Sequence, residues 1–212
     1  MIKCRLSETE RPILTFDPMT MSTAEPLVFL SCGGTIEKIY IADSGQLGFD
    51  RSRISDWLKA CRIAQPWRAE TVMLIDSLEM NEAHRQQLAE KIAATAESKI
   101  VVIHGTDTMV ESAKAVMARR AAHQTVVFTG AMVPASLENS DALYNLGLAT
   151  AAVQQSDPGV YIAMSGAVFA ADSVRKNRDK GIFESIQSDA ADTDTSNGTL
   201  RISKRKITGF FR

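Results

Sequence analysis

The 212-residue sequence lacks the features that mark several specialised classes of protein. Its 24 Lys and Arg are balanced by 25 Asp and Glu, which gives a formal net charge of −1 and no basic excess of the kind that nucleic-acid binding requires. No apolar run approaches the roughly 18 residues of a membrane span. We therefore expect neither a nucleic-acid partner nor insertion into a membrane.

Cysteine is scarce as well. The three residues Cys4, Cys32 and Cys61 include no pair with the Cys-x-x-Cys spacing of a zinc or redox site. An odd number of dispersed cysteines is typical of a reducing compartment, so we expect a cytoplasmic protein. Residues 1–23 lack the apolar segment of a signal peptide. We expect them to be an unstructured extension, with Met19 or Met21 as a candidate start of the chain.

From residue 27 onward, short runs rich in Val and Ile alternate with longer segments whose apolar residues recur every three or four positions. This alternation predicts an α/β domain over residues 24–184, with an open, mostly parallel sheet flanked by helices. The expected strands are 27–31, 71–75, 100–103, 125–129 and 160–164. Residues 185–212, which are acid-rich and then basic, are expected to form a poorly ordered tail.

Three helices are expected between these strands. One follows an Asn81 cap and has one apolar face, one runs over 109–122, and one runs over 141–155. Their inward residues are expected to be Leu88, Ile92 and Ala96 in the first, Ala113, Val116 and Met117 in the second, and Leu143, Leu146, Ala149 and Val153 in the third.

Polar motifs follow three of the strands, where an open parallel sheet binds its ligands. They are Ser-Cys-Gly-Gly-Thr-Ile-Glu at 31–37, Asp-Ser-Leu-Glu-Met at 76–80 and His-Gly-Thr-Asp-Thr-Met at 104–109. The glycine pair of the first motif allows a tight turn and close approach of a ligand to the Thr35 hydroxyl, although a simple strand-to-helix turn also explains it. A helix N-cap explains either Thr106 or Asp107 but not both.

Two of these motifs resemble the signatures of bacterial-type L-asparaginases, Thr-Gly-Gly-Thr-Ile and His-Gly-Thr-Asp-Thr-Met, and they stand in the same order. The resemblance continues through 76–80, 129–134 and 140–146, and it is to short members without the smaller C-terminal domain. It implies the fold of the asparaginase N-terminal domain. It also implies hydrolysis of L-asparagine to L-aspartate and ammonia, with no metal or organic cofactor.

The resemblance also implies roles for single residues. Thr35 matches the nucleophile that forms an acyl-enzyme, and Thr106 and Asp107 match the second active threonine and its adjacent aspartate. Lys176, in the loop 174–178, matches a lysine that would supply the cation activating Thr106; a solvated basic loop is the alternative. Tyr40 would lie on a flap over the site and bond to the oxygen of the nucleophile, with half-buried packing as the alternative.

Further residues are predicted to bind substrate: Gly34, Ser77, Glu79, Gly105 and Ala131. The negative charge of Asp107 suits a substrate α-ammonium group, and Glu79 would share that role. His104 is expected to bond locally at a strand end.

Three departures from the family pattern bear on the function. Cys32 replaces a threonine and is expected to be a small buried side chain. Leu78 replaces a glutamine that contacts substrate, and no second domain completes the ammonium site. We therefore expect a homodimer or larger assembly to cover the open site. Two alternatives stay open, namely a catalytically silent amino-acid-binding protein and an amidase for another amide.

Overall fold

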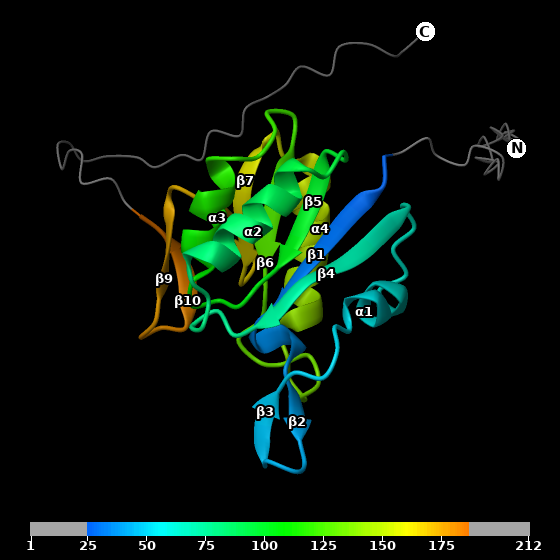
Figure 1. The fold of residues 1–212 in the computed structure, drawn as a ribbon, viewed down its shortest axis with the longest axis vertical. Coiled ribbons are helices and arrows are strands. Elements are labelled where there is room, and N and C mark those ends of the chain that lie inside the picture. Colours follow the sequence, from blue (N-terminus) through cyan, green and yellow to red (C-terminus); the bar gives the residue numbers. More distant parts are fainter. Residues whose placement is uncertain (1–24, 187–212) are drawn as a thin grey trace, which may run out of the picture.

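A six-stranded sheet forms the centre of this computed structural model, which describes residues 25–186 (Figure 1). Its strands lie in the order β4-β1-β5-β6-β7-β8. The first five are parallel and β8 is antiparallel to β7, which confirms the expected fold class. In chain order they are β1 (Leu27–Gly33), β4 (Trp67–Ile75), β5 (Lys99–Ile103), β6 (Thr125–Thr129), β7 (Gly159–Met164) and β8 (Ala167–Ala170).

All five predicted strands are present, but β4 begins at Trp67, four residues before the predicted start. This strand forms one edge of the sheet, and its added residues include charged side chains that hide the apolar pattern. Arg68 pairs with Glu97 at 2.6 Å, and Glu70 pairs with Lys91. Charged residues on an edge strand also oppose pairing with another sheet.

Helices cover both faces of the sheet (Figure 1). Helices α2 (Glu82–Ala93) and α3 (Met109–Met117) pack on one face, and α1 (Ile54–Ala60) and α4 (Ala142–Gln155) pack on the other. The Asn81 cap is confirmed, since its side chain accepts a hydrogen bond from the backbone N–H of His84 at 3.1 Å. Because α2 ends at Ala93, Ala96 lies beyond the helix and is exposed, contrary to the prediction.

Helix α3 is shorter than predicted, because it ends at Met117 and not at Ala122. The backbone N–H groups of Arg119 and Arg120 both donate to Val116 O, at 3.0 and 2.9 Å, and form a tight turn. The predicted inward positions of this helix are otherwise correct.

Several short elements were not predicted: the 3₁₀ helix η1 (Thr35–Glu37), helix α1, the hairpin of β2 (Ile39–Ile41) and β3 (Gln46–Gly48), strand β8, and the hairpin of β9 (Val174–Asn177) and β10 (Ile182–Ser185). Most are three or four residues long and partly exposed, so they lack a clear apolar period. Strand β10 includes Ser185, the first residue of the predicted tail. The rest of that tail, beyond Ile186, and the predicted extension 1–23 lie outside the described residues.

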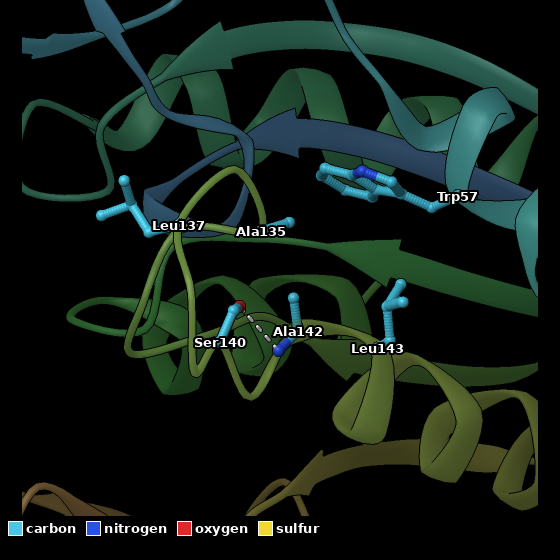
Figure 2. Close-up of a pocket in the computed structure, with 6 residues that line it drawn as sticks. All are labelled: Trp57, Ala135, Leu137, Ser140, Ala142 and Leu143. Carbon is cyan, nitrogen blue, oxygen red and sulfur yellow. Dashed lines mark hydrogen bonds between the residues drawn. The ribbon is translucent and has the colours of Figure 1, made fainter.

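An apolar pocket of about 250 Å³ lies between α1 and α4 (Figure 2). Leu143 lines it and is 49% exposed, so its predicted place in the core is wrong. Trp57 of α1 faces Leu143 across the pocket, and Leu137 lies at its loop side. Among residues 25–186, no helix has the length and apolarity needed to cross a membrane.

Candidate active site

Two glycines bring the ends of β1 and β5 into contact. Gly34 has φ 77° and ψ 179°, a conformation that is essentially restricted to glycine. A Cβ atom on Gly34 would lie 2.2 Å from the backbone nitrogen of Gly105, so the two backbones touch only because Gly34 has no side chain. Thr35 and Thr106 are the next residues of these loops, and both therefore lie at the same edge of the sheet.

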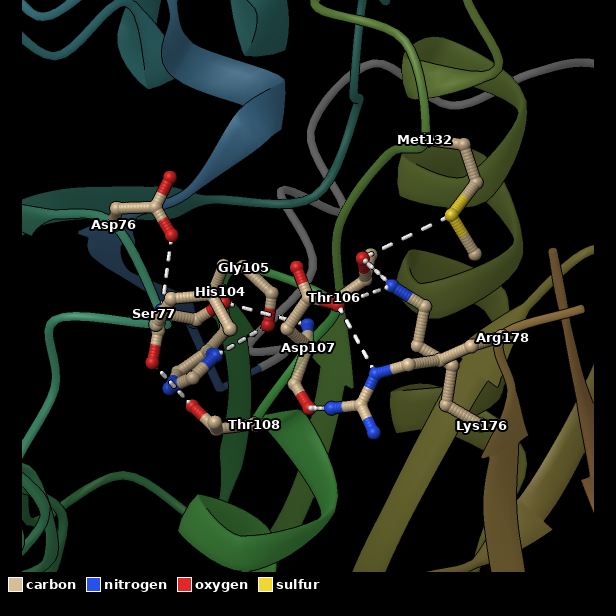
Figure 3. Close-up of polar contacts among 11 residues, drawn as sticks. Asp76, Ser77, His104, Gly105, Thr106, Asp107, Thr108, Met132, Lys176 and Arg178 are labelled. Atoms are coloured by element: carbon tan, nitrogen blue, oxygen red, sulfur yellow. Dashed lines mark hydrogen bonds and ion pairs between the residues drawn. The ribbon is translucent and has the colours of Figure 1, made fainter.

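A lysine 70 residues further along the chain than Thr106 contacts the pair formed by Thr106 and Asp107 (Figure 3). The Lys176 ammonium group donates to Thr106 Oγ1 at 2.8 Å and to Asp107 Oδ1 at 2.9 Å. Thr106 is buried, and its hydroxyl lies 3.8 Å from Met132 Sδ. Lys176 lies on strand β9 and not on a loop as predicted. Its amine nevertheless reaches the two predicted partners.

A second cation, Arg178, also contacts Asp107 and was missed by the sequence analysis. Its Nε lies 3.7 Å from Asp107 Oδ1, and its Nη2 donates to the backbone oxygen of Asp107 at 3.3 Å. Figure 3 shows the side chains of Lys176 and Arg178 both directed at Asp107. Arg178 lies in the turn directly after β9, where no strand period indicates the direction of a side chain, so the sequence offered no clear signal for it.

Ser77 ties the loop after β4 to the loop after β5. Its hydroxyl accepts from the backbone N–H of Asp107 at 3.3 Å, and its carbonyl accepts from Thr108 Oγ1 at 2.7 Å. A Cβ atom on Gly105 would lie 2.5 Å from Ser77 Oγ, so the contact requires glycine at that position as well. The predicted binding residues Gly34, Ser77 and Gly105 thus lie together beside Thr106.

Lys38 and Asp76 link the end of η1 to the same region. They form an ion pair in which each side chain is 22% exposed, and Asp76 also accepts from the backbone N–H of Leu78 at 2.9 Å. Burial raises the pKa of Asp76, but the contact with Lys38 and the hydrogen bond from Leu78 outweigh burial and hold the pKa below its usual range. The Lys38 carbonyl accepts from Ser136 Oγ at 2.8 Å, which adds a third loop to the assembly.

Glu37 anchors the turn that carries Thr35. It is 1% exposed and accepts hydrogen bonds from Ser31 Oγ, from Ser52 Oγ at 2.9 Å and from the backbone N–H of Arg53 at 3.1 Å. Burial raises the pKa of the Glu37 carboxyl, against the effect of these hydrogen bonds. The carboxylate therefore joins β1, η1 and the start of α1.

The loop after β6 is held by helix α4. The Asp141 carboxylate accepts from the backbone N–H of Met132 at 3.0 Å, and Asn145 donates to Gly130 O at 3.1 Å and to Asp141 at 2.8 Å. Ala131, which is predicted to bind substrate, is fully buried in the core.

Tyr40 and Glu79 lie at the periphery. Tyr40 is on β2, in the hairpin that projects from the sheet in Figure 1, and is 62% exposed, so the alternative of half-buried packing is wrong. Its hydroxyl lies 4.0 Å from the position of a Cβ on Gly45, near the turn of the hairpin. Glu79 is exposed in the turn after β4.

His104 and Cys32 are both buried beside the site, which confirms the expected burial of Cys32, and His104 bonds locally as expected. His104 Nδ1 lies 2.7 Å from Gly105 O, and burial lowers the pKa of His104 to about 4. Burial raises the pKa of the Cys32 thiol, because it disfavours the charged thiolate. Within the described part of the chain, no three His, Cys, Asp or Glu residues are grouped as metal ligands would be.

Comparison with known proteins places this site in a family. The model of the family described as Asparaginase, N-terminal, matches residues 26–207. The chain belongs to the asparaginase family. The match contains every site residue described above, and it extends into the segment predicted to be a tail.

Relatives within the asparaginase family are considerably longer. A probable periplasmic L-asparaginase of Haemophilus influenzae is 35% identical over 114 residues, which cover 51% of this chain and 33% of that protein. A glutaminase-asparaginase of Pseudomonas fluorescens is 30% identical over 130 residues, which cover 58% of this chain and 34% of that protein. The chain therefore spans about a third of the length of these curated relatives.

The solved structures agree with the assignment. A probable cytoplasmic L-asparaginase from Campylobacter jejuni is 29% identical, with a TM-score of 0.67 over 76% of this chain and 53% of that one. A thermostable L-asparaginase from Thermococcus kodakarensis, at 24% identity and a TM-score of 0.65, shares the fold.

Proposed function

We propose that this protein is an amidohydrolase that converts L-asparagine to L-aspartate and ammonia, with Thr35 as the nucleophile. The observation that carries the proposal is the contact of Lys176 Nζ with both Thr106 Oγ1 and Asp107 Oδ1, at 2.8 and 2.9 Å. A buried threonine, a carboxylate and an amine converge there beside the loop of Thr35. Such a group can move a proton to or from a reacting amide.

The reaction has two steps. In the first, Thr35 Oγ attacks the side-chain carbonyl carbon, its proton passes to the acid–base group, and the C–N bond breaks as nitrogen takes up a proton and leaves as ammonia. In the second, water attacks the resulting ester, the Thr35 oxygen regains a proton, and L-aspartate is released. The sum is one amide and one water converted to one acid and one ammonia, with Lys176, Thr106 and Asp107 in the same state before and after.

The test is ammonia release from L-asparagine by the purified chain and by two variants of Thr35. We expect Thr35→Ala to reduce kcat by several orders of magnitude and Thr35→Ser, which retains a hydroxyl, to keep measurable activity. Circular dichroism should show both variants folded. Retention of more than about a tenth of the wild-type rate by Thr35→Ala, a change of under ~1.4 kcal/mol in activation free energy, would exclude this nucleophile. A wild-type chain that binds asparagine without turnover would instead be a binding protein.

Two further proposals accompany this function, one on assembly and one on location. A homodimer or larger assembly would cover the open edge of the site, and light scattering that finds only a 23.1 kDa species at working concentration would reject it. A cytoplasmic location is supported by Cys61, which is exposed and has no disulfide partner among residues 25–186. Cell fractionation of the natural host tests the location.

A further inference from the structure

Asp107, which is predicted to hold the substrate ammonium group, already contacts positive charges of the protein. Its carboxylate contacts two cations of the protein, Lys176 at 2.9 Å and Arg178 at 3.7 Å. A substrate α-ammonium group placed on Asp107 would be the third cation beside this one carboxylate, after Lys176 and Arg178. Because like charges at such short range repel each other, the second protein cation weakens ammonium binding.

The other cations of the same hairpin are directed elsewhere. Arg175 binds Glu184 at 2.8 Å, and Lys180 lies 3.9 Å from the other oxygen of that carboxylate. Beside Lys176, Arg178 is therefore the hairpin residue whose positive charge is directed at the predicted ammonium site. The hairpin also lines a pocket of about 340 Å³, whose lining includes Lys176 and Arg178 together with Asp179.

We infer that Arg178 is a specificity-determining residue, which shifts this site away from ω-amides with an α-ammonium group and toward dicarboxylic acid monoamides that lack that charge. The inference rests on the proposed amidohydrolase function and names the substrate class of the same site. Succinamate, which has the carboxamide and carboxylate of asparagine and no amino group, is the simplest substrate of this class.

The effect should be moderate, because the Arg178 side chain is 66% exposed and water screens its charge. We expect Arg178→Ala to raise kcat/KM for L-asparagine relative to succinamate by about fivefold, the range of a partly exposed ion pair. Arg178→Lys retains the positive charge and should restore most of the wild-type ratio. A purely structural role would change both substrates together and leave their ratio constant.

The matched control is Lys180→Ala, which removes a cation of the same hairpin that is 67% exposed and contacts Glu184. Its substrate ratio should equal that of the wild type. A ratio that is unchanged in Arg178→Ala, or changed as much in Lys180→Ala, would overturn the inference. A change confined to Glu79→Gln would also overturn it, and would assign ammonium discrimination to the turn after β4.

Binding measurements separate this inference from the reaction itself. Isothermal titration calorimetry with succinate and L-aspartate, which differ by the ammonium group, should show that the ratio of the two affinities shifts toward L-aspartate in Arg178→Ala. If the chain hydrolyses neither amide, the proposed function fails, and this comparison still decides the role of Arg178. Equal preferences in wild type and variant would reject it.

Discussion

Gly34 leaves no room for a side chain at the contact between the loops after β1 and β5. In Gly34→Ala the new Cβ would lie 2.2 Å from the backbone nitrogen of Gly105, at a backbone conformation that L-residues avoid. We expect the free energy of unfolding to fall by about 2–5 kcal/mol and activity to fall with it, because Thr35 moves away from Thr106. Urea denaturation measures the first effect and ammonia release the second.

Gly147→Ala is the matched control for this substitution. Gly147 lies in α4, and a Cβ there would meet nothing within 4 Å. Because alanine favours the helix, stability should rise by about 0.5–1 kcal/mol. If both variants were equally stable, close backbone contact at Gly34 would not be the reason for glycine there.

Lys176 is the residue whose charge can be removed with the least change in volume, by Lys176→Met. If its amine serves Thr106, the rate of asparagine hydrolysis should fall by about 10²–10⁴-fold, the usual effect of losing an acid–base partner. Lys180→Met on the same hairpin should remain near wild type. A substantial loss in Lys38→Met or Lys180→Met with none in Lys176→Met would place the active cation elsewhere.

At the scale of elements, η1 depends on one buried carboxylate for its position. Glu37→Ala would leave Ser31 Oγ, Ser52 Oγ and the backbone N–H of Arg53 without their acceptor. Unpaired buried polar groups cost about 1–3 kcal/mol each, and after local rearrangement we expect a total loss of about 2–4 kcal/mol in unfolding free energy. Activity should fall as well, since Thr35 is the first residue of η1.

Glu90→Ala is the comparison for the Glu37 variant, because Glu90 is 59% exposed and pairs with Arg119 on the surface. Chemical denaturation should show a change within about 0.5 kcal/mol for it. A Glu37→Ala chain as stable and active as Glu90→Ala would show that η1 is held by its apolar contacts alone.

At the scale of the whole molecule, His104 links stability to pH. Burial lowers its pKa to about 4 in the folded chain, against about 6.5 when unfolded, so the unfolded state binds more protons between these values. The contribution of His104 to the free energy of unfolding is therefore complete above pH 6.5 and decreases as the pH falls toward 4. At about 1.4 kcal/mol per pKa unit, the loss amounts to ~3 kcal/mol.

Urea denaturation at several pH values between 4 and 7 measures this dependence. His104→Asn keeps an N–H donor near Gly105 O and does not titrate, so its stability should fall less over the same range. The exposed His123 provides the control, and His123→Asn should show the full wild-type slope. Identical slopes in all three chains would mean that His104 does not govern the acid response.

Sequence alone determined the features that depend on local order in the chain. Apolar period gave the five parallel strands, and the Asn81 cap gave the start of α2, because these signals involve neighbouring residues. The polar motifs after β1, β4 and β5 were also found from neighbouring residues. Their meeting at one place was expected because parallel strands end at one edge of the sheet. The family resemblance added Lys176, whose role as an activating cation stays a prediction.

Only the tertiary structure decided which distant groups meet. Arg178 and Asp107 lie 71 residues apart, and their contact depends on how the β9–β10 hairpin packs beside the sheet. The anchoring of η1 by Glu37 and the exposure of Leu143 likewise depend on what packs against each side chain. The residue pattern of one segment does not show which distant segment packs against it. Short exposed strands, in addition, have too few buried positions to show a period.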